Sequence, residues 1–196
     1  MNENRFDYHD KIFSGISANS MPAPDIFSGD NERGEIEIVF APNEIPGDEK
    51  NFFVGTFGLF LANFAGSDES FFTVSDGAEK IPVQLQITDN EPTKNYLENL
   101  AQQIKSTREN FLPYEEIRAK YNFSDAPNFS FDSEISTDTN LNFGVRREGE
   151  KFFVAANYRK GSYSEKFINS MLDAYARLTE NFCAAKTLGE VDMLSE

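Results

Sequence analysis

The chain has 196 residues, a length that suits one domain able to bury a real core. Its formal net charge of −15 argues against binding to nucleic acids or membrane surfaces, because both need clustered Lys and Arg. No apolar run approaches the roughly 20 residues of a transmembrane helix, and the N-terminus lacks the pattern of a signal peptide. Cys183 is the only cysteine, so an internal disulfide is excluded. We therefore expect a soluble cytoplasmic protein.

The N-terminal residues 1–33 are polar and contain scattered Pro and Gly, which indicates a traversing or linker segment with a short helix at Asp7–Phe13. A strand follows at Glu35–Phe40, because isoleucine and phenylalanine alternate there with polar residues.

The stretch Glu49–Ala65 is apolar nearly all round, which predicts a helix buried on more than one side and the most buried element of the chain. Gly55 and Gly58 lie three residues apart within it. A glycine-rich phosphate loop would need a preceding strand and a following Lys-Ser/Thr, and both are missing. We interpret the two glycines as sites of close helix packing.

The middle of the chain alternates between short strands and amphipathic helices. Asp76-Gly77 indicates a hairpin whose loop we expect to exceed two residues. The predicted elements are strands at Phe71–Val74 and Ile81–Ile87, helices at Pro92–Phe111 and Tyr114–Tyr121, a strand at Asn128–Asp132 and a polar loop at Asp132–Asn140.

The C-terminal part reads as a hairpin followed by a helix and an extended tail. Strands are predicted from Leu141 and from Lys151 to Tyr158, around a turn at Gly149, which can adopt a positive φ. The helix ends near Ala184, and either Ser162 or Ser164 can cap it; Ser162 with Glu165 has the spacing of a capping box. Its apolar stripe must lie on a sheet.

This order of elements, β-α-β-β-α-α-β-β-β-α, predicts an α/β (α+β) two-layer sandwich. A mixed sheet would form one layer, with the helices Pro92–Phe111 and Ser164–Ala184 packed on one of its faces.

The residue types offer little chemistry. His9 is the only histidine, which excludes a metal site built on several imidazoles. Cys183 sits beside the apolar face of the last helix, as a structural thiol would. The acidic residues at 30–32 and 132–138 fit solvated loops better than a calcium site. We therefore assign no catalytic, cofactor-binding or metal-ligating residue, and we expect no cofactor.

Taken in order, however, the segments resemble the C-terminal half of a nonribosomal peptide synthetase condensation domain, which has the CoA-dependent acyltransferase-like fold. Several segments carry the resemblance, and Pro113, Tyr114 and Glu115 match a Pro-Phe-Glu in the family's His-Gln-Asp-x-Pro-Phe-Glu motif. The others are Tyr8-His9 to Gly15, Met21–Asp25, the strand Glu35–Phe40, the helix ending at Phe64-Ala65-Gly66, and Asn157-Tyr158 through the last helix to Leu188–Leu194.

Two departures from the family bear on function. The segment Asp76–Pro82 is short where the family has an extended loop with Gly-x-Phe-Val-Asn-Thr. The family's His-His-x-x-x-Asp-Gly motif, whose second histidine serves the condensation reaction, cannot be present in a chain with one histidine. The resemblance thus implies a subdomain at residues 34–186 and, at 187–196, a linker toward a following adenylation domain.

The leading hypothesis is a truncated, non-catalytic condensation-type subdomain of a synthetase for secondary metabolites. Its partners would be an adenylation domain or other synthetase domains, a carrier protein among them. One alternative is an acyl-transfer half-domain that works only with an N-terminal half supplied in trans, and another is a free-standing protein-interaction module. We favour a monomer over a homodimer, because the 33 acidic residues discourage self-association.

Overall fold

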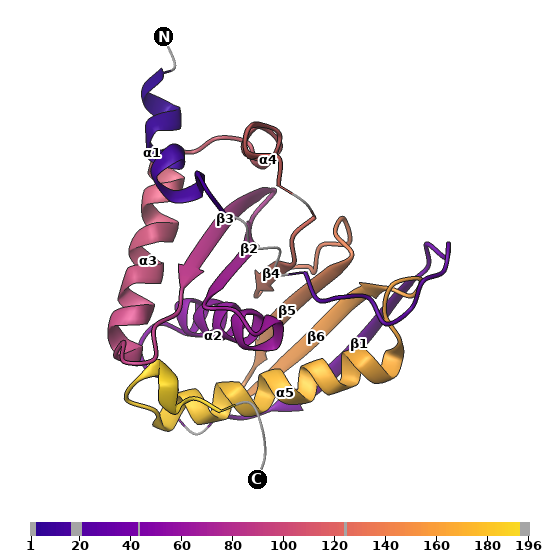
Figure 1. The fold of residues 1–196 in the computed structure, drawn as a ribbon. Coiled ribbons are helices and arrows are strands. Elements are labelled where there is room, and N and C mark those ends of the chain that lie inside the picture. Colours follow the sequence, from indigo (N-terminus) through magenta and orange to yellow (C-terminus); the bar gives the residue numbers. More distant parts are fainter. Residues whose placement is uncertain (1–2, 17–20, 43, 124, 193–196) are drawn as a thin grey trace.

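The computed structural model describes residues 3–16, 21–42, 44–123 and 125–192, and these form one six-stranded mixed sheet with helices packed on it (Figure 1). The strand order is β1-β6-β5-β4-β2-β3, in which β4 runs parallel to both β2 and β5 and the other pairs are antiparallel. The predicted α/β fold class is confirmed. The strands are β1 (Arg33–Phe40), β2 (Glu69–Asp76), β3 (Glu79–Gln86), β4 (Asn128–Phe131), β5 (Leu141–Glu148) and β6 (Lys151–Arg159).

Helix α2 (Glu49–Ala65) lies at the centre of the core, against the sheet and flanked by two other helices (Figure 1). Every residue from Phe52 to Ala62 is buried, as its all-round apolar sequence predicts. A Cβ on Gly55 would lie 2.6 Å from Leu97 Cδ2, and one on Gly58 would meet the side chains of β2 and β3. The glycines therefore serve close packing, as predicted.

Helices α3 (Thr93–Glu109) and α5 (Glu165–Ala184) share this core with α2 and the same face of the sheet. Tyr96 donates a hydrogen bond to the Gly55 carbonyl at 2.8 Å, and Tyr175 donates one to the Phe53 carbonyl at 3.0 Å. Each bond satisfies a buried hydroxyl and ties a flanking helix to α2.

A smaller apolar cluster lies on the opposite face of β2, under helices α1 (Glu3–Phe13) and α4 (Tyr114–Tyr121). Phe71 and Phe72 are adjacent on β2, so their side chains enter different clusters. Helix α1 begins before the predicted Asp7, and it makes the N-terminal segment part of the packed structure. Across the described ranges, no helix has the length and hydropathy needed to cross a membrane.

Three local predictions need correction or completion. The loop between β2 and β3 is two residues long, because Ser75 pairs with Lys80 and Asp76 with Glu79; Gly77 has a φ of 64°. The prediction of a longer loop was wrong, since two polar residues continue the strand. Ser164, rather than Ser162, caps α5. The tail expected to be extended contains a 3-10 turn, η1 (Leu188–Glu190).

Candidate functional site

His9 is fully buried on α1, where its ring lies edge-on to Tyr8 at 5.2 Å and tilted over Phe13 at 6.0 Å. The Tyr8 hydroxyl lies 3.0 Å from Thr107 Oγ1 and fastens α1 to α3. Asp10 on the same helix pairs with Lys120 of α4 at 2.8 Å. The imidazole is thus part of the packing that attaches α1 to its neighbours.

Cys183 is half-buried on α5, and its thiol donates to the Thr179 carbonyl at 3.4 Å. Burial raises the pKa of the Cys183 thiol. Because the thiolate is the nucleophile, this environment lowers the reactivity of the side chain.

The acidic loop residues stabilise turns and ion pairs. Asp30 Oδ1 accepts from the Glu32 amide at 2.8 Å, and Asp132 Oδ1 accepts from the Arg147 amide at 2.8 Å. Asp138 pairs with Lys80 at 2.7 Å. Within the described part of the chain, no group of three or more His, Cys, Asp or Glu side chains could hold a metal ion.

The face of the sheet turned away from α2 carries a layer of buried polar side chains that sequence reasoning missed. Asn128 Oδ1 accepts from Thr73 Oγ1 at 2.8 Å, and Asn128 Nδ2 donates to Ser75 Oγ at 2.9 Å. Ser130 Oγ donates to the same Ser75 oxygen at 3.2 Å. The alternation Asn-Phe-Ser-Phe in β4 is the sequence signal for this layer, since its polar residues share one face.

The layer continues across β5 and β6. Asn142 Oδ1 accepts from Thr139 Oγ1 at 2.8 Å, and Asn142 Nδ2 donates to the Thr139 carbonyl at 3.0 Å. Arg33 reaches both the Thr139 carbonyl and Asn157 Oδ1 at 2.8 Å. Because these buried groups have partners, the layer makes the outer face a rigid platform.

Beside this layer the outer face is hollowed into a groove of about 350 Å³. Arg146 Nη2 donates to both carboxylate oxygens of Glu37, at 3.0 and 3.1 Å. The Arg146 guanidinium also lies 4.1 Å from the centre of the Phe153 ring. The groove combines apolar and charged surface, and two of its charged residues, Glu37 and Arg146, pair with each other. The lining residues are Glu35, Glu37, Ser133, Glu134, Ile135, Gly144, Val145, Arg146, Phe153 and Ala155.

No family model and no curated protein matches the chain, but solved structures match it over almost its whole length. It is similar to the starter condensation domain of rhizomide synthetase RzmA, with 14% identity and a TM-score of 0.76 over 99% of this chain and 55% of that one. It is also similar to a chain in the complex of the X-domain and OxyB from teicoplanin biosynthesis, with 10% identity, a TM-score of 0.81, and 100% and 56% covered. The chain has the fold of half a condensation domain. It spans about half the length of these solved structures.

The residues that resemble the family's Pro-Phe-Glu lie at the start of α4. Pro113 precedes the helix, and Tyr114 is buried with Lys80 Nζ 5.8 Å from its ring centre. Burial raises the pKa of Tyr114 to about 12, so its hydroxyl stays protonated at neutral pH. Glu115 is exposed and lies 3.6 Å from Arg118. These residues place α4 over the outer face of the sheet.

The motif segment Met21–Asp25 fastens the N-terminal region to the start of α5. Tyr163 donates to the Pro22 carbonyl at 2.8 Å. The Asp25 carboxylate accepts from the Ser164 amide at 2.8 Å and from Ser164 Oγ at 2.5 Å. Ser164 in turn caps the helix. The sequence offered Ser164 as one of two possible caps and Asp25 as part of a family segment. It did not predict their contact, because the two residues are 139 positions apart.

The C-terminal segment that resembles the tail of the family is held against the loop before α3. Leu188 and Val191 are buried in the main core. The Thr93 amide donates to the Lys186 carbonyl at 3.0 Å, and the Leu188 amide donates to the Glu91 carbonyl at 3.0 Å. The segment predicted to be a linker is therefore packed against the rest of the fold as far as residue 192. Met193 to Glu196 lie outside the described residues.

Proposed function

We propose that this chain is the C-terminal half of a condensation-type domain and that it serves a structural or docking role in a peptide synthetase without catalysing condensation itself. One observation carries the proposal. The chain matches about half of a condensation domain along almost its whole length, and its single histidine is buried where α1 packs on its neighbours. The proposed location is the cytoplasm, and the proposed division keeps residues 34–186 as the subdomain.

The chemistry of the reaction supports a non-catalytic role. Forming an amide from a carrier-bound thioester requires an amine held against the carbonyl and assistance with proton transfer. In the resembled family, this assistance comes from a His-His-x-x-x-Asp-Gly motif. His9 is the only imidazole here, and Cys183 has a raised thiol pKa.

The proposed docking surface for an adenylation domain is the outward side of α5 together with residues 187–192. Its support is positional: α5 runs along the outside of the molecule, and the C-terminal segment folds back beside its end (Figure 1). The exposed side of α5 carries both signs of charge, at Glu165, Lys166, Asp173, Arg177 and Glu180. Mixed charges of this kind can set the register of a partner.

Catalysis is tested by mixing the purified chain with an acyl-loaded donor and an aminoacyl-loaded acceptor carrier protein and measuring dipeptidyl product by mass spectrometry. We expect no product above a control without the chain. Product that His9→Ala abolishes, in a variant with an unchanged circular dichroism spectrum, would overturn the non-catalytic assignment. Product that forms only after an N-terminal half is added in trans would support the acyl-transfer half-domain instead.

Docking is tested separately by titrating the chain with a purified adenylation domain and measuring binding by calorimetry. The variant Asp173→Arg changes the charge on the outward side of α5, and Asp138→Arg provides the same change on the other face of the sheet. We expect only the first to weaken binding. Equal effects would reject the outward side of α5 as the docking surface, and no binding at all would remove the adenylation domain as the partner.

A further inference from the structure

The two edges of the sheet differ in how their backbone groups are satisfied. On β3, the Ile87 amide donates to the Asp68 carbonyl at 2.7 Å, so in this ladder the odd-numbered residues bond to β2 and the even-numbered ones face outward. Pro82 has no amide hydrogen to offer there. The Gln103 side chain of α3 accepts from the Gln84 amide at 3.1 Å and donates to the Gln84 carbonyl at 2.8 Å. This edge is therefore closed by the chain itself.

The other edge, β1, has backbone groups that no other part of the described structure pairs. The Lys160 amide donates to the Glu32 carbonyl at 2.9 Å, so the even-numbered residues of β1 bond to β6. The amides and carbonyls of Glu35, Glu37 and Val39 consequently point away from the sheet. In the described part of the chain, β1 ends the strand order and has β6 as its one neighbouring strand (Figure 1).

The side chains along this edge alternate in character between the two faces. Glu35, Glu37 and Val39 lie on the outer face, and all three are exposed; Val39 retains 52% of its accessible surface. Ile36 and Ile38 lie on the inner face and are partly buried against the main core, which leaves some of their apolar surface uncovered. The groove next to Glu35 and Glu37 extends the outer surface of the edge toward β5.

We propose that the β1 edge binds an extended segment of a partner protein as an added strand, in which Lys or Arg alternates with apolar residues. A basic side chain of this segment would lie directly opposite Glu35, and a second would share the Glu37 carboxylate with Arg146, which lies 3.0 Å from it. The apolar side chains of the segment would cover Ile36 and Ile38. The chain's net charge of −15 favours a basic partner. It disfavours a second copy, whose own β1 would place Glu35 and Glu37 near the same residues.

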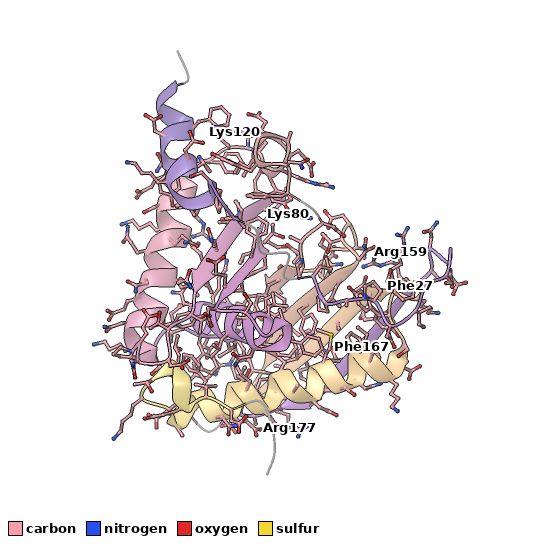
Figure 2. The ribbon with its side chains drawn as sticks, in the orientation of Figure 1. Phe27, Lys80, Lys120, Arg159, Phe167 and Arg177 are labelled. Atoms are coloured by element: carbon pink, nitrogen blue, oxygen red, sulfur yellow. The ribbon has the colours of Figure 1, made fainter. Side chains whose placement is uncertain are left out.

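This proposal concerns a different surface from α5 and the C-terminal segment, so it stands or falls independently of the proposed function. Figure 2 shows the labelled Phe167 and Arg177 on α5, the helix of the proposed adenylation-domain surface, whereas the proposed strand site runs along β1. Binding to the Lys-Val peptide and binding to an adenylation domain are measured separately, so failure of one proposal can be told from failure of the other.

The test uses isotope-labelled full-length chain and a short blocked peptide that alternates Lys with Val. Amide hydrogen exchange is followed by NMR at Glu35, Glu37 and Val39, with Ile36 and Ile38 as internal references. Without peptide, we expect fast exchange at the three odd-numbered residues and slow exchange at the two isoleucines. Adding the Lys-Val peptide should slow exchange at the odd-numbered residues, and a Glu-Val peptide of the same length should not.

Variants locate the binding to this edge. Val39→Pro removes an outward amide without removing a bond to β6, and should weaken binding about tenfold. Glu35→Lys should weaken it roughly fivefold by placing like charges opposite each other. Glu79→Lys makes the same charge change on the closed edge and should leave the affinity within about twofold.

Three results would overturn the proposal. They are unchanged exchange at the odd-numbered residues with the Lys-Val peptide, equal binding of the Glu-Val peptide, and equal effects of Glu35→Lys and Glu79→Lys. Protection that increases with protein concentration in the absence of peptide would identify a second copy as the occupant and would also reject the basic segment. Unfolding curves for each variant separate loss of the edge from loss of the fold.

Discussion

Phe57 occupies the middle of the core, with no exposed surface. Its ring lies between 5.0 and 6.5 Å from five other aromatic rings on α2, three strands and α5. We expect Phe57→Ala to lower the free energy of unfolding by about 3–5 kcal/mol, because the cavity cannot close around so many fixed neighbours. The measurement is urea unfolding. Phe27→Ala is the control, since Phe27 is 89% exposed and should cost less than about 0.5 kcal/mol.

Tyr114 should make the fold sensitive to alkali. Burial raises its pKa from the usual 10.0 to about 12, so the folded chain keeps a proton that the unfolded chain loses. This contribution is fully present below pH 10.0 and is lost as the pH rises to about 12. Tyr114→Phe replaces the tyrosine with the phenylalanine of the family motif. It should reduce the loss of unfolding free energy between pH 10.0 and about 12 by about 2–3 kcal/mol. Identical pH profiles for the two proteins would contradict this expectation.

Helix α5 depends on a contact from a distant segment. Asp25 accepts two hydrogen bonds from Ser164, whose own Oγ accepts from the Phe167 amide at 3.1 Å. We expect Asp25→Ala to cost about 1 kcal/mol of unfolding free energy and to speed amide exchange in the first turn of α5. Asp173→Ala, an exposed change in the same helix, should cost less than about 0.5 kcal/mol. A loss of the same size in both variants would show that the contact with Ser164 is not what stabilises the helix.

Helix α2 and the β2–β3 hairpin show what local patterns can determine about an element. The all-round apolar sequence of α2 predicted its burial, because no polar face remained to meet water. The hairpin loop was predicted too long, because the apolar alternation that predicted the second strand begins only at Ile81. In the folded chain Lys80 has partners in Asp138 and the Tyr114 ring, both distant in sequence, which allow a charged residue to continue the strand.

At the scale of the whole molecule, we expect a monomer. The large apolar residues that remain exposed in the described structure are Phe27, Val39 and Phe64, and they come from three different segments. Together with a net charge of −15, this surface offers little for self-association. Sedimentation velocity at several concentrations and at low and high salt checks the expectation. A dimer whose population increases with salt would show that charge repulsion alone was keeping the chains apart.

The sequence by itself determined the order of the elements, the central helix and the resemblance to half a condensation domain. These features depend on hydrophobic periodicity and on residues close together in the chain, so local interactions are enough to predict them. Tertiary structure decided which residues meet across the sheet: the polar layer around Asn128, the Asp25 contact with Ser164, and the closed and open edges. Each of these depends on strand order and on contacts between distant segments, and no local pattern specifies them because the same alternation suits either edge of a sheet.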